Sequence, residues 1–545
     1  MAPSDQPSQP GSAVPGAAPT AAPTAAPTAA PGLPALLAST RRAVRPSGPP
    51  TDEIHIWTSP DGVDRKTALA VIDLAMRGGV AMLATGAAAA DVTATVLMLT
   101  NSYGLRSVHV DVTYTSITVS YHRGPEADPM TVMRIVRYRV QDFTRLERLR
   151  ELVIDLSQEP LDVDEARVRF DAVIHAPHPY RRWLVTAAGA GLAAGVAALV
   201  GAGPTVILLS FLTAAVVTRV LDALAKAGVA SFFAQCVGSA IPTVVATLVV
   251  VAGANGIEFA QDLSPSLIVA SGIVLLLSGL SIVGAAEDAL SGYYVTAGAR
   301  GFEVIALSLG IAIGITIVLA VGQKLGYPIA ISERTILTNN LGVQLVSAAI
   351  IAVCFAITSY SSGRAAIVAG VAAVLGWGIL AVVETVVGFG PATASATAAL
   401  IIGFTARLAA RRAGISALAV TTAAIVPLLP GRMAYQGISQ IVSQPSGIGL
   451  AVGLPTLAGA FGLGLGLAAG VSLGNYFAGL ILSRRTGQRP ARAIGSTVRR
   501  DPRAVIPGQP DPVPEPPPQL SDTGELPLVR PARDPAEEPS AAPEG

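Results

Sequence analysis

Polar and apolar positions divide the chain into two regions of different character. Charged residues are frequent from about Thr51 to Arg182 and scarce from Trp183 to about Ser483. A transmembrane helix needs about 20 predominantly apolar residues in a row, and the second region holds ten apolar runs that approach or exceed this length. We therefore expect a small cytoplasmic domain followed by an α-helical polytopic membrane domain of about ten transmembrane helices.

The ten apolar runs define a topology that the basic residues can test. The runs lie near residues 183–200, 204–218, 229–252, 266–286, 302–322, 337–359, 365–387, 392–410, 413–429 and 450–482. Arginine and lysine are enriched in the cytoplasmic loops of membrane proteins. If the first region is cytoplasmic, most basic residues between the runs fall in cytoplasmic loops, whereas the outer loops hold Lys324, Arg334 and Arg432. The pattern predicts ten spans with both termini in the cytoplasm.

The first region has the pattern of a small α+β domain. Residues 65–104 place apolar side chains three and four positions apart, which favours two successive helices. Residues 107–122 alternate and are rich in β-branched side chains, which favours two strands. Helical spacing returns over residues 128–156, with Asp128 as the expected N-cap. The strands should therefore be followed by one long helix.

Both ends of the chain are biased in composition. The first fifty residues repeat the tetrapeptide AAPT, and the last sixty are rich in proline and charged residues. Such segments cannot bury enough apolar surface to offset chain entropy, so we expect both to be disordered. The N-terminal tail lacks the apolar core of a secretory signal, so the domain after it should stay in the cytoplasm. The expected domains are a tail over 1–50, the α+β domain over 51–180, two membrane halves over 181–330 and 331–485, and a second tail over 486–545.

Composition excludes several classes of function. The formal net charge is +1, so no concentrated basic face is available for a nucleic acid. The two cysteines, Cys236 and Cys354, both lie in apolar runs, so neither a disulfide framework nor a thiolate metal site is expected. No phosphate-binding loop of the pattern G-x-x-x-x-G-K-[ST] occurs. We therefore expect no metal, no cofactor and no ATP-driven step, and any transport should draw on a gradient.

Two Gly-Pro turns point to an internal repeat. The segment VGAGPT ends the first apolar run and starts the second, and VGFGPA lies between runs seven and eight. Proline is favoured as the first residue of a helix, and the preceding glycine permits a sharp reversal. A basic loop that ends in Ala-Gly follows each hairpin. We expect Gly203-Pro204 and Gly390-Pro391 to form outer hairpin turns of a parallel repeat.

Carboxylates in the apolar region are candidate functional groups, because a charge at membrane depth costs about 2.5–3.5 kcal/mol. Glu384 lies within the seventh run, and the membrane region contains no histidine, so Glu384 is the candidate for proton coupling. Asp288, Arg300 and Glu303 flank the inner ends of runs four and five. Since Arg300 and Glu303 share a helix face, we expect them to act as a gate or an ion pair at the inner mouth.

A second kind of chemistry is conceivable in the first region. His109 and Asp111 are two positions apart on a predicted strand and so share one face, as a His–carboxylate pair for acid–base or metal chemistry requires. No third ligand or nucleophile motif stands at a fixed spacing from them. A solvated outer face of the sheet explains the pair more simply, and we expect no catalytic residues.

Three segments of the chain resemble the threonine/serine exporters. They lie at residues 85–129, at residues 275–303 with the sequence LLLSGLSIVGAAEDALSGYYVTAGARGFE, and at residues 424–437 with the sequence AIVPLLPGRMAYQG. The resemblance covers roughly Asp52 to Arg485. It implies a cytoplasmic α+β domain and ten spans in two five-span halves.

The resemblance also implies which residues carry function. In the first half they are Gly279, Asp288, Gly292, Gly298, Arg300 and Glu303, and in the second half Pro430 and Gly431. Two positions depart from the family pattern. Ser278 stands where the first half usually has proline, and Thr93 stands where the soluble helix often has glutamate, which weakens the case for hydrolytic chemistry.

The family resemblance implies a secondary active exporter of threonine and serine in the cytoplasmic membrane, driven by the proton motive force. Its partners would be a small amino acid, protons and the lipid bilayer, with a homo-oligomer left open. Helices broken at Gly-Pro or Pro-Gly offer free backbone groups to a substrate, and the expected lining residues are Gly431, Arg432, Thr421, Thr422, Gln235 and Asn475. Two alternatives stand beside this function: a dicarboxylate exporter for succinate-like substrates, and a membrane-anchored hydrolase acting through the N-terminal domain.

Overall fold

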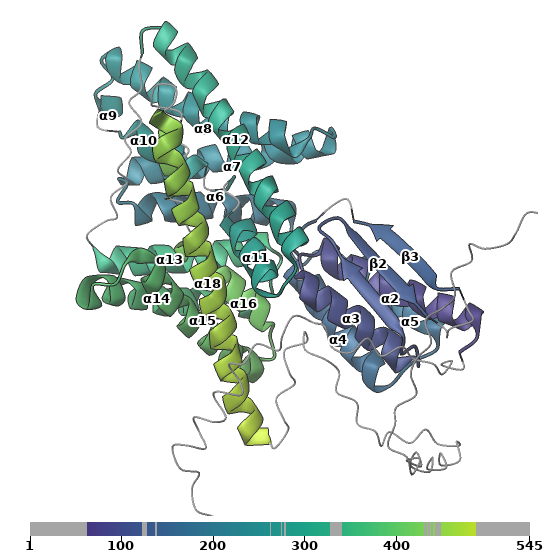
Figure 1. Ribbon diagram of the computed structural model, residues 1–545. Helices are drawn as coiled ribbons and strands as arrows, with labels where there is room; N and C mark the ends of the chain where they lie inside the picture. Colours follow the sequence, from purple (N-terminus) through teal and green to yellow (C-terminus); the bar gives the residue numbers. More distant parts are fainter. Residues whose placement is uncertain are drawn as a thin grey trace, which may run out of the picture. The chain divides into compact units, whose positions relative to one another are not determined.

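The computed structural model describes residues 63–122, 128–136, 139–261, 263–273, 275–276, 279–327, 340–429, 433, 436–437, 440–441 and 448–486. These residues form a small α+β domain and a set of long apolar helices (Figure 1). The small domain and the helices as far as Ala478 belong to one compact unit, and the chain from Gly479 onward forms a second.

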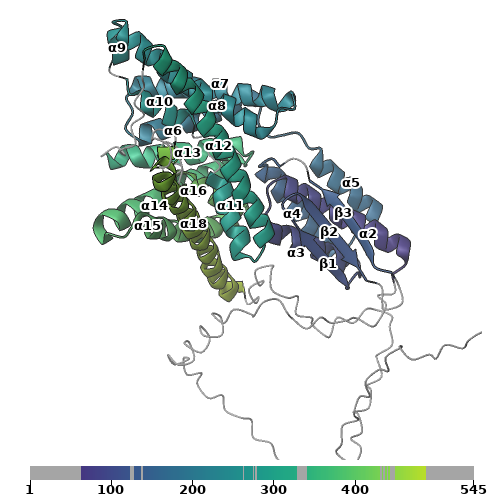
Figure 2. The same ribbon diagram turned by 45° about the horizontal axis from the view of Figure 1, so that its top comes forward.

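The small domain stacks helices on one face of an antiparallel sheet (Figure 2). Its elements are α2 (Arg65–Ala84), α3 (Ala89–Ser102), β1 (Val108–Val112), β2 (Ser116–Tyr121), β3 (Met130–Ile135), α4 (Phe143–Gln158) and α5 (Val163–Ile174). Helices α2 and α3 pack on the sheet, and α4 and α5 pack on these helices. Alternation along β2 buries Ile117, Val119 and Tyr121 in the core. The α+β expectation is confirmed.

The prediction of one long helix over residues 128–156 is wrong for the first half of this segment. Residues Met130–Ile135 form β3, which pairs with β2 so that Val132 faces Val119. The helix starts only at Phe143, where the N-cap is Asp142, whose carboxylate accepts a hydrogen bond of 2.9 Å from the backbone N–H of Arg145. Pairing with a neighbouring strand overrides local helical spacing, because it satisfies the backbone groups of a whole segment.

The apolar region folds into helices close to the expected spans. They are α6 (Arg182–Leu199), α7 (Pro204–Lys226), α8 (Ser231–Ala254), α9 (Glu258–Gln261), α10 (Pro265–Gly272), α11 (Gly279–Leu290), α12 (Tyr294–Lys324), α13 (Leu341–Thr358), α14 (Gly363–Val382), the π-helical η1 (Val383–Val387), α15 (Pro391–Ala413), α16 (Ala417–Ile425), the 3₁₀ turn η2 (Val426–Leu428) and α18 (Ile448–Thr486). The chain is a multi-pass helical membrane protein.

Among the described residues, nine helices are long and apolar enough to cross a membrane. One of them is α2. In its most apolar stretch 61% of the residues are buried inside the protein, against 28–44% in the other helices, because its apolar face forms the core of the small domain. The other eight coincide with expected spans. The two remaining spans are shorter pieces: the fourth corresponds to α10 and α11, and the ninth to α16 and η2.

The two Gly-Pro turns start helices, as the sequence predicts. Pro204 is the first residue of α7 with Gly203 as N-cap, and Pro391 is the first residue of α15 with Gly390 as N-cap. A missing N–H is harmless there, because the first N–H groups of a helix have no partner within it. That these turns face the outside of the cell stays a prediction.

Helix packing relates the halves by a shift of five helices. Helix α10 packs on α6, α7 and α8, and α16 packs on α13, α14 and α15. In each half the last helix also approaches the third through glycines: a Cβ on Gly310 would lie 2.8 Å from the carbonyl oxygen of Phe232, and a Cβ on Gly470 would lie still closer to the carbonyl oxygen of Ala396.

This packing pairs the first helix with the sixth. The expected parallel repeat instead equated the first two helices with the seventh and eighth, from their Gly-Pro turns and basic loops, and it stays a prediction. The two shortened spans then occupy equivalent positions, fourth in each half. Interrupted helices at equivalent positions of two repeats are where transporters place their substrate sites.

Candidate functional site

A cavity of about 550 Å³ lies where the small domain meets both membrane halves. Its lining comes from α3 and the segment before it, the β1–β2 turn and the loop before α4 on the small domain, and from α11, α12, α13, α16 and α18 among the membrane helices. Its charged lining residues are Asp91, Arg139, Glu287, Arg300 and Glu303. Both signs of charge therefore face one space, and the second half adds hydroxyl and amide groups from Thr421, Thr422, Ser472 and Asn475.

Arg300 is held in place by a buried carboxylate. Its Nε lies 3.2 Å from Oδ2 of Asp288, whose side chain is 1% exposed, although the angle is not that of a hydrogen bond. The other oxygen, Oδ1, accepts a hydrogen bond of 3.4 Å from the backbone N–H of Ala89 in the small domain. Gly284 makes room for the arginine, because any Cβ there would collide with a guanidinium nitrogen. Asp288 thus positions Arg300 and offsets its charge.

Glu303 has a different partner from the one expected. Its Oε2 accepts a hydrogen bond from the hydroxyl of Tyr114, which comes from the turn between β1 and β2. The helix-face argument predicted a pair between Arg300 and Glu303, but among the described residues Arg300 pairs with Asp288. The two residues line one cavity but do not form the ion pair that was one of the two expected roles, and their role as a gate stays a prediction.

Arg139 completes this charged cluster. Its guanidinium carbon lies 4.1 Å from the centre of the Tyr114 ring, and its Nη2 donates a hydrogen bond to the backbone carbonyl of Tyr114. Burial, together with the hydrogen bond to Glu303, raises the pKa of Tyr114 to about 12. Burial and the neighbouring Arg300 lower the pKa of Arg139 to about 10. At neutral pH, therefore, Tyr114 is a neutral donor and Arg139 a cation.

Two polar atoms in the wall from the second half lack partners in the described part of the chain. They are Oγ1 of Thr421 on α16 and Oδ1 of Asn475 on α18, and both are buried. A buried polar atom without a hydrogen bond is unfavourable by about 1–3 kcal/mol. Such atoms at a cavity are suited to a ligand that supplies the missing hydrogen bonds.

Two predicted site residues lie away from this cavity. Gln235 on α8 donates a hydrogen bond of 3.4 Å from Nε2 to the carbonyl oxygen of Leu276, and its Oε1 has no partner among the described residues. Glu384 is exposed on the π-helical segment η1, and neither residue lines the cavity. Gly431 and Arg432, like Pro430, fall outside the described residues.

The paired side chains on the outer strand remain on the surface. His109 and Asp111 are both exposed on β1, and the ring of His109 lies 5.5 Å from that of His122. Neither His109 nor Asp111 lines the cavity. Within the described ranges, no group of three or more His, Cys, Asp or Glu side chains could hold a metal ion.

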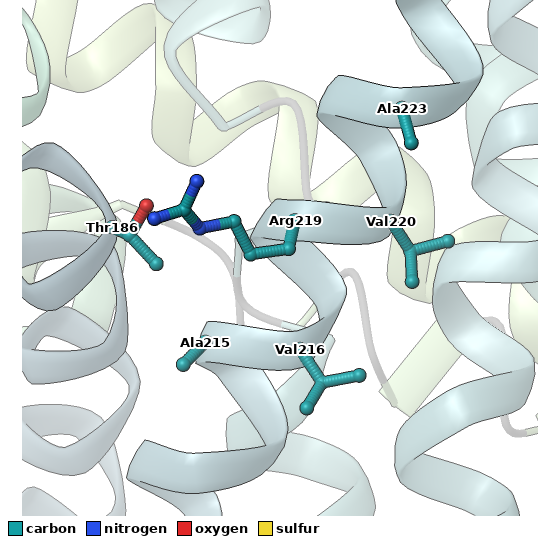
Figure 3. A pocket seen from close by; sticks show the side chains of 6 residues that line it. All are labelled: Thr186, Ala215, Val216, Arg219, Val220 and Ala223. Atoms are coloured by element: carbon teal, nitrogen blue, oxygen red, sulfur yellow. The ribbon is translucent and has the colours of Figure 1, made fainter. Parts of the chain in front are cut away.

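A second hollow lies on α6 and α7 and contains no predicted site residue. Figure 3 shows Arg219 extending toward Thr186, with Val216 and Val220 beside it on α7. Apart from Arg219 and Thr186, its lining is aliphatic. It lacks the convergent polar groups that a site for a polar solute needs.

The sequence pattern did not identify Tyr114 or Arg139 as parts of the site. Both are in irregular segments of the small domain, where neither helical nor strand periodicity applies. The available signal was weak: an aromatic residue at the tip of a short turn, where binding groups are often found. Glu287, the neighbour of Asp288 in the sequence, also lines the cavity.

The fold and the cavity define a class: a multi-pass helical membrane protein with a polar cavity between two related halves, as in secondary transporters. Residues 73–322 match the family described as "Putative threonine/serine exporter", and residues 344–473 match "Threonine/Serine exporter, ThrE". The chain belongs to the threonine/serine exporter family, which confirms the resemblance seen in the sequence.

Two relatives support this assignment over most of their length. A "Probable threonine/serine exporter" from Mycobacterium tuberculosis is 36% identical over 425 residues, which cover 76% of this chain and 78% of the relative. A "Threonine/serine exporter" from Corynebacterium glutamicum is 31% identical over 443 residues, which cover 81% and 88%. No solved structure matches the chain.

Proposed function

We propose that this protein exports threonine and serine from the cytoplasm across the cell membrane. The observation that carries the proposal is the cavity of about 550 Å³, which presents fixed charges of both signs beside polar atoms without partners. A zwitterion with a side-chain hydroxyl needs these groups. The names of the two relatives agree with this substrate class.

The charged groups suit the two ends of an amino acid. Arg300 offers a planar fork of donors to the substrate carboxylate, and Asp288 keeps this fork oriented from behind. Glu303 offers a carboxylate to the substrate ammonium group. The side chains lie three residues apart on α12, so one rigid helix sets their spacing.

The atoms without partners suit the substrate hydroxyl. Oδ1 of Asn475 can only accept a hydrogen bond, and a hydroxyl can donate one. Thr421 can donate or accept. A site built around a substrate hydroxyl rejects the analogue that lacks it, because its polar atoms are then left unpaired. We infer that these residues distinguish threonine and serine from aliphatic amino acids.

A proton gradient is the energy source that we propose. Entry of one proton per substrate at 100 mV supplies about 2.3 kcal/mol, and this supports a substrate gradient of about 50-fold at 1.4 kcal/mol per decade. The proposal includes both termini in the cytoplasm, in accord with the distribution of basic residues. Glu384 stays the predicted proton carrier.

The alternative functions fit the cavity less well. A dicarboxylate would meet Arg139 and Arg300, but it would also face three carboxylates, Asp91, Glu287 and Glu303. A hydrolase acting through His109 and Asp111 would not use the cavity at all, since neither residue lines it.

Efflux from loaded cells tests the proposed function. Cells that express the full chain are loaded with threonine-, serine- and alanine-containing dipeptides or with succinate, and the amino acids and succinate in the medium are followed. We expect export of threonine and serine above the level of cells with an empty vector, and no added export of alanine or succinate. Succinate export without threonine export would replace the proposal with the dicarboxylate function. Unchanged efflux of every solute would contradict it.

A further inference from the structure

The cavity is closed on one side by the small domain rather than by membrane helices. Tyr114 and Arg139 supply this wall with polar groups, and Gly86 and Ala88 also line it. In a cytoplasmic domain, these residues stand between the cytosol and the charged groups on α12. A substrate from the cytosol therefore has to pass the small domain to reach Arg300 and Glu303.

Tyr114 is at the tip of a tightly fixed turn. The N–H of Thr113 donates to the carbonyl oxygen of Ser116 at 2.9 Å, and the two hydroxyl oxygens of these residues lie 2.8 Å apart. The N–H of Val136 donates to the carbonyl oxygen of Thr115 at 2.7 Å. The tip cannot shift independently of the sheet, so Tyr114 leaves Glu303 either by rotating its side chain or by moving with the whole domain.

The small domain is attached to the first membrane half around this contact. The hydroxyl of Tyr293 donates to Oγ1 of Thr93 at 3.0 Å, and Oγ1 of Thr296 donates to the carbonyl oxygen of Val112 at 3.1 Å. Val112 ends β1, directly before the turn that carries Tyr114. The start of α12 therefore holds the turn against the cavity.

The same domain is also attached to the second membrane half. The N–H of Phe143 donates to the carbonyl oxygen of Ser359 at 3.1 Å, and the hydroxyl of Tyr180 donates to the carbonyl oxygen of Ser361 at 2.7 Å. Between these positions, the ring of His178 stacks on Tyr360 with 4.4 Å between centres. The domain thus bridges both halves beside the cavity, and motion of the halves relative to each other must strain or break one set of contacts.

We propose that Tyr114 is the gating residue of the cytoplasmic entrance. Its hydroxyl is hydrogen-bonded to the Glu303 carboxylate in the empty protein, and the ammonium group of the substrate displaces this hydroxyl. This inference rests on the proposed function, because it takes an amino acid as the substrate. The displacement is favourable because an ammonium group brings a full charge and three donors to a carboxylate, whereas the phenol brings one neutral donor. Arg139 positions the ring by stacking on it.

If the Tyr114 hydroxyl competes with the substrate for Glu303, its removal should improve substrate binding. Tyr114→Phe keeps the ring under Arg139 and removes the hydroxyl. Glu303 is then free for the substrate, and we expect the apparent KM for cytoplasmic threonine to fall about tenfold, the scale of one hydrogen bond to a charged group. A tyrosine that contacted the substrate would give the opposite sign.

Uptake of labelled threonine by inside-out membrane vesicles measures this KM, because the cytoplasmic face of the protein then faces the medium. Tyr293→Phe is the matched control: it removes a hydroxyl that also joins the small domain to α12, at a residue outside the cavity lining. We expect its KM to equal that of the unmodified protein. Tyr114→Leu, which also lacks a donor, serves as the second variant and should lower the KM in the same way.

The outcomes separate the inference from the function on which it rests. If vesicles with the unmodified protein take up no threonine, the proposed function fails. If they do, and Tyr114→Phe and Tyr114→Leu are present in the membrane with an unchanged KM, Tyr114 only helps the domain to dock and the gate is refuted. A raised KM in Tyr114→Phe would make Tyr114 a substrate contact and would also overturn the gate.

Discussion

Glu303 and Glu384 are both carboxylates of the membrane region, yet the protein surrounds them differently. Glu303 lines the cavity, accepts a hydrogen bond from Tyr114 and lies one helical turn from Arg300. Glu384 is exposed on the π-helical end of α14, just before the turn that leads to Pro391. Two carboxylates that both lie in or next to apolar runs of the sequence thus have different surroundings in the structure.

The difference lies in partners that are distant in the sequence. Glu303 meets the small domain, almost two hundred residues earlier in the chain, and it shares its cavity with residues from α16 and α18. A carboxylate in such a site can bind a substrate with fixed geometry. An exposed carboxylate near a helix end has the freedom to exchange protons with its surroundings, which is the role predicted for Glu384.

The largest effect on transport is expected for Arg300, one of the two cations that line the cavity. Arg300→Gln removes the partner of the substrate carboxylate and leaves Asp288 buried without its counter-charge. Truncation of one member of a buried charge pair typically costs 2–5 kcal/mol, so we expect the efflux rate of threonine per molecule to fall about 100-fold or more. Efflux from dipeptide-loaded cells, normalised to the amount of protein in the membrane, gives this rate.

The matched control for Arg300 is Arg219→Gln, which removes an exposed arginine on α7 from the hollow in Figure 3. Its efflux should equal that of the unmodified protein. Equal loss in both variants would mean that any arginine of the helices matters to the same degree, and the comparison between cavity and surface would lose its basis.

An intermediate effect is expected at Asn475. Asn475→Leu removes the acceptor that we assign to the substrate hydroxyl, so the KM for threonine should rise about fivefold, the scale of one neutral hydrogen bond. Inhibition by 2-aminobutyrate, which lacks the hydroxyl, should not weaken. Asn255→Leu, at an exposed position after α8, is the control. Equal loss of affinity for both amino acids would remove Asn475 from hydroxyl recognition.

The smallest effect on exchange is expected at Glu384. Glu384→Gln should leave threonine exchange between compartments of equal pH unchanged, because the residue does not line the cavity. As the predicted proton carrier it should still be needed for uphill efflux, which the variant should lose together with its pH dependence. If Glu384→Gln concentrates threonine against its gradient as the unmodified protein does, the proton uses another group.

Local sequence patterns predicted the elements better than their connections. The apolar runs located eight long membrane helices, and the Gly-Pro segments located the first residues of α7 and α15. The strand at Met130–Ile135 was missed because its evidence is the pairing with β2 and not its own spacing. The parallel repeat stays a prediction, since two similar turns do not say which helices pack together.

The site was predictable in part. Arg300 and Glu303 were found because charge is costly in an apolar segment, and both line the cavity with Asn475. Charge alone could not separate Glu303 from Glu384, nor could polarity separate Asn475 from Gln235. Tyr114 and Arg139 could not be found in this way, because their role depends on docking of the small domain against α12.

The central claim is that threonine binds in this cavity, and substrate protection of a single cysteine tests it most directly. Ser472 lines the cavity and Ser291 is exposed at the end of α11, so each is replaced by cysteine in a chain that lacks Cys236 and Cys354. In inside-out vesicles that still transport, threonine should slow maleimide labelling of Ser472→Cys and leave that of Ser291→Cys unchanged, and 2-aminobutyrate should protect less. Equal labelling of Ser472→Cys with and without saturating threonine would contradict the account.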